Sequence, residues 1–85
     1  MADEFTIGEL MYCLLQDIQD YLMYYDNDDL DDIVEKLDDI KTHYDSDTLT
    51  QLDVARLEMI QTYFDHEGFN QFALDTNEII KRLQK

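Results

Sequence analysis

Residues 28–44 read DDLDDIVEKLDDIKTHY, and their apolar positions recur with the spacing of an α-helix. These positions are Leu30, Ile33, Val34, Leu37, Ile40 and Tyr44. Side chains three and four positions apart share one face of a helix, so the segment predicts an amphipathic helix over residues 28–44. Short polar side chains at residues 26–29 provide candidates for its N-cap.

The segments on either side of this helix have the same periodicity. Before it, residues 6–25 predict a helix whose apolar face consists of Ile7, Met11, Leu14, Ile18, Tyr21 and Tyr25. After it, Thr48 and Gln51 have the spacing of a capping box, which predicts a helix over residues 49–66. Its first apolar stripe is Leu49, Leu52, Ala55, Met59 and Tyr63, and the adjoining stripe is Leu57, Ile60 and Phe64. Such a broad apolar arc predicts heavy burial of both stripes.

Gly68 is expected to end the third helix in the left-handed conformation, with Phe69 packing back onto Phe64. A last helix is expected over residues 70–83, with basic residues in its final turn. Residues 75–78 offer an alternative start for a shorter helix.

Composition supports an all-α fold. The 85 residues include no proline and only two glycines, so a fold with many tight turns is disfavoured. Hydrophobic residues make up 45% of the chain, which is enough for one core. We expect residues 1–85 to form a single domain, a compact bundle of about four helices joined by short connections.

The chain is strongly acidic. It carries 21 Asp and Glu against 6 Lys and Arg, a formal net charge of −15. Such a chain repels nucleic acid and anionic membranes and attracts basic proteins. Cys13 is the only cysteine, and neither a leader peptide nor a membrane-spanning run is apparent. The expected location is therefore the cytoplasm.

The residues required for common catalytic and metal sites are missing from the sequence. His43 and His66 fall on different predicted helices, and one cysteine with two histidines is too few for a zinc site. An EF-hand calcium loop requires glycine at its sixth position and glutamate at its twelfth. A loop starting at Asp26 would have Asp31 at the sixth position, and a loop starting at Asp45 would have Arg56 at the twelfth, so neither segment fits. We expect no catalytic residues, no metal site and no cofactor, and hence a protein that is not an enzyme.

The second predicted helix carries a row of carboxylates opposite its apolar face. The row consists of Asp28, Asp31, Asp32, Glu35, Asp38 and Asp39, with Asp29 at its flank. These seven acids occur over about 17 Å of helix axis, or roughly one per 2.4 Å, against about one charge per 1.7 Å in duplex DNA. Further acids at Asp17, Asp20, Asp45, Asp47 and Asp53 are expected to extend this field.

In size, charge and the carboxylate row on a helical scaffold, the chain resembles the small acidic DNA-mimic inhibitors of phages and mobile elements, of the antirestriction and anti-CRISPR type. The resemblance implies a non-enzymatic inhibitor that presents the row to a basic nucleic-acid-binding protein, such as a phage-defence nuclease. Direct binding to nucleic acid or membrane is not expected.

An apolar surface on the first predicted helix supports an alternative function. Beside its main apolar face, this helix has a second stripe that includes Tyr12, Leu15, Met23 and Tyr24. The stripe is either buried on a second side of the helix or forms a contact with a partner or a second copy of the chain, giving a homodimer. In that hypothesis the protein is an adaptor or assembly module, and the acids only make it soluble.

Overall fold

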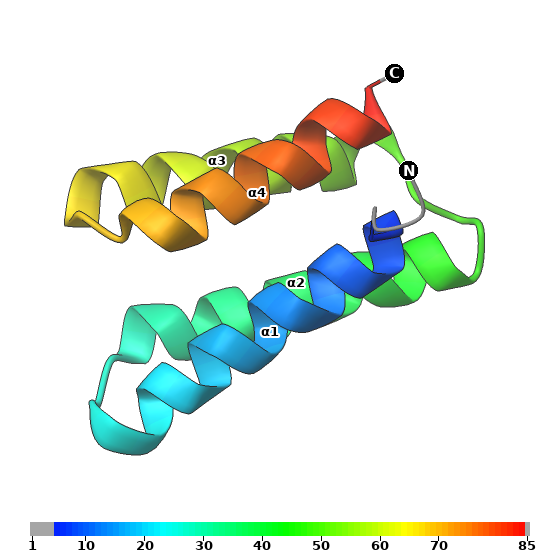
Figure 1. The fold of residues 1–85 in the computed structure, drawn as a ribbon. Coiled ribbons are helices and arrows are strands. Elements are labelled where there is room, and N and C mark those ends of the chain that lie inside the picture. Colours follow the sequence, from blue (N-terminus) through cyan, green and yellow to red (C-terminus); the bar gives the residue numbers. More distant parts are fainter. Residues whose placement is uncertain (1–4, 85) are drawn as a thin grey trace.

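The computed structural model describes residues 5–84, which form four helices in an antiparallel bundle (Figure 1). The helices are α1 (Ile7–Tyr24), α2 (Asp28–Asp45), α3 (Gln51–Glu67) and α4 (Asn70–Leu83). The expected all-α bundle is confirmed. One hairpin consists of α1 and α2 and the other of α3 and α4, with α1 against α4 and α2 against α3. Of the neighbouring helix pairs, α2 and α3 share the narrowest contact.

The first two helices start with the side-chain caps that their sequences favour. Thr6 and Glu9 form a capping box, in which each side chain accepts a hydrogen bond from the other residue's amide, at 3.1 and 2.8 Å. At the start of α2, the Asn27 side chain accepts a hydrogen bond from the amide of Leu30 at 3.1 Å. Each cap satisfies an amide that has no partner within its helix.

The third helix begins later than its sequence suggested. The predicted pairing of Thr48 with Gln51 is wrong, because the N-cap is Thr50 and its capping-box partner is Asp53. The Thr48 hydroxyl instead lies 2.8 Å from that of Ser46 and donates to the carbonyl of His43, within the turn that follows α2. That turn passes through the left-handed conformation at Asp47, with φ of 61°.

The end of α3 has the predicted Schellman geometry. Gly68 is left-handed, with φ of 81°, and the amide of Phe69 donates to the carbonyl of Phe64 at 2.9 Å. The rings of Phe64 and Phe69 are 6.2 Å apart, which confirms the expected contact. The last helix then runs without a break over residues 70–83, so the alternative start at residues 75–78 is wrong.

The core takes a narrow stripe from each helix. Its buried hydrophobic residues are Met11, Leu14, Leu15, Ile18, Leu30, Ile33, Leu37, Ile40, Leu57, Ile60, Phe64, Ala73, Ile79 and Ile80. An aromatic cluster closes one end, where the Tyr21 ring packs edge-on against Phe69 at 5.4 Å. At the other end, Arg82 donates to the carbonyl of Phe5, which ties the last turn of α4 to the residues before α1.

One of the two apolar stripes predicted for α3 lies largely outside the core, and only its ends, Leu49 and Tyr63, pack against it. Leu52 is 62% exposed and Met59 is 73% exposed, and Ala55 is exposed as well. The buried side of α3 is the adjoining stripe of Leu57, Ile60 and Phe64, continued by Asp53. The expectation that both stripes are buried is therefore wrong, because α2 covers only part of this side of α3.

None of the helices within residues 5–84 combines the length and apolar character needed to cross a bilayer.

The two glycines provide a test of the helix boundaries. Gly68→Ala is expected to lower the free energy of unfolding by about 1–2 kcal/mol, because a Cβ disfavours the left-handed conformation. No atom lies within 4 Å of the added Cβ, so the cost is conformational. Gly8 is helical and a Cβ there meets only ordinary contacts, so Gly8→Ala should leave stability unchanged or raise it by up to about 1 kcal/mol. Urea denaturation measures the free energy of unfolding of both variants. Equal effects of the two substitutions would contradict the left-handed conformation of Gly68 at the end of α3.

Candidate protein-binding surface

The carboxylates predicted to form a row do lie together on the outer side of α2. The six residues are all exposed, and we call them the acidic face: Asp28, Asp31, Asp32, Glu35, Asp38 and Asp39. Asp29 at the flank is exposed as well. The side of α2 that packs on the core consists of Leu30, Ile33, Leu37 and Ile40. Burial of these four side chains therefore directs the carboxylates away from the protein.

Few cations of the chain itself compensate this face. Among residues 5–84, Asp39 is the only member of the acidic face with an Arg, Lys or His side chain within 4.0 Å, namely Arg56 at 3.2 Å and the His43 ring at 3.8 Å. Lys41 pairs instead with Asp45, at 2.7 Å, and Lys36 is exposed. The negative potential of the other five carboxylates is thus reduced mainly by solvent and salt.

The surrounding acids do not all extend the face as expected. Asp53 is only 2% exposed and therefore adds no surface charge of its own. Asp75 on α4 is partly buried, which raises its pKa; the hydrogen bond from Gln71 opposes this rise and the negative charge of Asp17 adds to it. Asp17 is thus close enough to Asp75 on α4 for its charge to act there.

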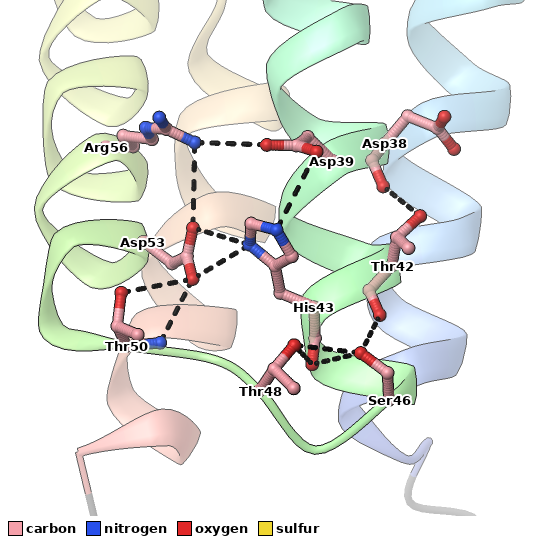
Figure 2. Close-up of polar contacts among 9 residues, drawn as sticks. All are labelled: Asp38, Asp39, Thr42, His43, Ser46, Thr48, Thr50, Asp53 and Arg56. Atoms are coloured by element: carbon pink, nitrogen blue, oxygen red, sulfur yellow. Dashed lines mark hydrogen bonds and ion pairs between the residues drawn. The ribbon is translucent and has the colours of Figure 1, made fainter.

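A polar cluster between α2 and α3 surrounds the buried Asp53 (Figure 2). Both carboxylate oxygens of Asp53 lie 3.1 Å from Nδ1 of His43, and one of them lies 3.7 Å from Arg56. The amide of Thr50 also donates to Asp53, at 3.0 Å. Burial alone would raise the pKa of Asp53, but the hydrogen bonds from Thr50 and His43 outweigh it and the pKa lies below its ordinary value.

The arrangement of this cluster indicates a structural role. The two ring nitrogens of His43 face Asp53 and Asp39, and within residues 5–84 no hydroxyl or thiol is hydrogen-bonded to the ring. A Ser-His-Asp type of site needs a nucleophile on the second nitrogen. Instead, the cluster caps α3 and joins it to α2. The spacing of Thr50 and Asp53 matches a capping box and is the sequence signal that could have located it.

The apolar stripe predicted on α1 is only partly exposed. Tyr12, Met23 and Tyr24 are 56%, 75% and 79% exposed, whereas Leu15 is 7% exposed and belongs to the core. Assigning Leu15 to a partner contact was therefore wrong, because its side chain is enclosed by the bundle. Exposed Gln16 and Gln19 lie between Tyr12 and Met23, so the remaining side chains do not form a continuous patch.

An open groove lies between α2 and α3, beside the acidic face. Its walls and floor are formed by Asp29, Asp32, Ile33, Lys36, Arg56, Met59, Ile60 and Tyr63, and its volume is about 350 Å³. Burial raises the pKa of Tyr63, the side chain of Asn27 partly offsets this rise, and the negative charge of Asp29 adds to it. The groove thus combines an apolar floor with one wall that belongs to the acidic helix.

Comparison of the chain with protein-family models, curated proteins and solved structures found no match. In the described part of the chain, no three His, Cys, Asp or Glu residues are grouped so that they could hold a metal ion. Function must therefore be inferred from the surface itself.

Replacing the buried carboxylate tests the structural role of the cluster. Asp53→Asn is expected to lower the free energy of unfolding by about 1–3 kcal/mol at neutral pH, because the cap and the pairing with His43 and Arg56 are weakened. The pKa of Asp53 is lowered by folding, so its stabilising contribution is complete above the unfolded pKa of about 4 and is lost as the pH falls through the folded pKa. Denaturation at several pH values should show the deficit shrinking below about pH 4.

Glu35→Gln is the control, because it removes an exposed carboxylate from the middle of α2. It should change stability by less than about 0.5 kcal/mol. An equal loss in both variants, or a deficit in Asp53→Asn that is independent of pH, would show that the cluster does not stabilise the protein in this way.

Proposed function

We propose that this protein is a non-enzymatic inhibitor that binds a basic, nucleic-acid-binding protein through the acidic face of α2 and competes there with nucleic acid. The observation that carries this proposal is the exposure of all six carboxylates, five of them without an ion pair among the described residues. A helix selected for stability alone would alternate acids with lysines, because like charges at these spacings are unfavourable.

The physical properties of this face suit a surface that binds phosphates. Arg and Lys side chains that contact nucleic acid form charge-assisted hydrogen bonds with phosphate oxygens, and carboxylate oxygens can accept the same bonds. Together with Asp29, which makes seven acids between residues 28 and 39, these carboxylates are spaced along the helix at about the density of DNA phosphates, roughly one per 2.4 Å against one per 1.7 Å. A net charge of −15 also accelerates the encounter with a basic partner at low salt.

The alternative function, an adaptor that works through α1, has less support. Without Leu15, its proposed surface is reduced to Tyr12 and, about three helical turns away, Met23 and Tyr24. Polar side chains separate the two parts, whereas interfaces depend on a compact, buried centre. We therefore place the working surface on α2.

Charge reversal on α2 tests this function. The immobilised wild-type chain should retain one or more basic proteins from a lysate of its own organism, and both raised salt and added duplex DNA should release them. The triple variant Asp31→Lys, Glu35→Lys, Asp38→Lys should bind the same proteins roughly a hundredfold more weakly, because three attractive contacts become repulsive. Quantitative binding at several salt concentrations measures the effect.

A matched control reverses three acids elsewhere: Asp17→Lys, Glu58→Lys and Asp65→Lys. It changes the net charge by the same amount and leaves the acidic face intact, so it should reduce affinity much less. Equal losses in the two triple variants, retained proteins that duplex DNA does not displace, or a column that retains nothing would each contradict the proposal. Loss of binding in Tyr12→Asp alone would favour the α1 surface.

A further inference from the structure

The groove between α2 and α3 gives the protein an apolar contact surface that the acidic face lacks. It runs along residues 29–36 of α2 and 56–63 of α3, about 10 Å or two helical turns. Ile33 and Ile60 form its floor, and both are otherwise buried. Met59 and Tyr63 form its α3 side. This is enough length for the apolar face of a short helix that inserts two or three side chains.

Met59 is the most informative residue of this groove. Its side chain is 73% exposed although it lies directly beside the buried Ile60, and Leu52 one heptad earlier is also exposed. Methionine side chains adapt to varied apolar partners and are common at surfaces that bind helices. Neither Met59 nor Leu52 belongs to the core, so both are available for contact with another molecule.

The charge around the groove restricts what can occupy it. Asp29 and Asp32 lie on its α2 wall, and the acidic face continues beyond them. Arg56 on the opposite wall is already paired with Asp39 and Asp53, which leaves Lys36 as the other cation of the groove. A second copy of this chain would bring another charge of −15 against the same surface, which opposes self-association.

We propose that the groove binds a cationic amphipathic helix of the partner protein, whose apolar side chains contact Ile33, Met59 and Ile60 while its Lys and Arg side chains pair with the acidic face. This inference rests on the proposed function and adds to it the kind of element that is recognised. The acidic face attracts the helix, and the groove determines how it is placed.

A peptide probe tests the location of the contact. The probe is an 18-residue helical peptide with leucine on one face and lysine on the other, added to the isotope-labelled full chain and followed by NMR. Chemical-shift changes are expected along residues 29–36 and 56–63. Changes confined to Tyr12, Met23 and Tyr24, or spread evenly over all four helices, would overturn the inference. The same peptide with glutamate in place of lysine should not bind; equal binding would also overturn it.

A pair of substitutions tests the apolar contribution. Met59→Ala should weaken peptide binding about tenfold, because it removes an apolar anchor at the centre of the contact. Leu74→Ala is the matched control, since Leu74 is 62% exposed on α4 and does not line the groove, and it should change affinity by less than twofold. Circular dichroism verifies that both variants keep the helical fold. Equal affinity of Met59→Ala and the wild type would refute a contact in the groove.

The salt dependence separates this inference from the proposed function. Met59→Ala should weaken binding by the same factor at every salt concentration, because an apolar contact is not screened. The triple reversal of Asp31, Glu35 and Asp38 should flatten the salt dependence instead. If the reversal abolishes binding of the cellular partner and Met59→Ala has no effect on it, the proposed function stands and the groove contact fails. If neither variant has an effect, both fail.

Discussion

Burial of the apolar side of α2 is the constraint on which the rest of this structure depends. Burial of Leu30, Ile33, Leu37 and Ile40 stabilises the bundle by about 1.5–3 kcal/mol each. Among the seven acids between residues 28 and 39, four pairs are spaced by three positions and three pairs by four. Each such pair costs about 0.2–0.5 kcal/mol, so the burial of one or two core residues offsets them all. The helix can therefore carry its charge without losing its place in the core.

Asp53 shows how differently a single carboxylate behaves when it is buried. An unpaired charge in the core would cost several kcal/mol, yet this one accepts hydrogen bonds from Thr50 and His43 and lies near Arg56. The same Arg56 also pairs with Asp39, at one end of the acidic face. The polar cluster around Asp53 thus offsets the charge at the end of the acidic face nearest the α2–α3 connection. It leaves the other carboxylates of this face without a compensating cation among the described residues.

Most of the fold could be predicted from the sequence because the apolar residues of all four helices recur at helical spacing, and on α2 they form a single clear stripe. The helix bounds other than the start of α3, the Schellman ending at Gly68 and the exposure of the carboxylates on α2 follow from local spacing. In contrast, α3 has two stripes of similar hydrophobicity, and only contact with its neighbours decides which is buried. The stripe that is buried contains Asp53, and an aspartate in a sequence normally indicates an exposed position. Its burial depends on His43, ten residues earlier, which only the fold brings beside it. Leu15 was misplaced for the same reason: both sides of α1 are apolar.

The wrong prediction that both apolar stripes of α3 are buried and the presence of a groove beside α2 have one physical cause. Because α2 and α3 share the narrowest contact in the bundle, Leu52 and Met59 of the second apolar stripe of α3 remain exposed beside the most acidic helix. A surface that only imitated the phosphates of DNA would require charge and no apolar contact. Contacts to phosphates orient a protein on its ligand but do little to distinguish one ligand from another. Apolar contact adds affinity that salt does not screen, and its shape excludes partners that are merely basic. Within the proposed function, the proximity of the two features therefore favours recognition of one particular basic protein over a general attraction to cations.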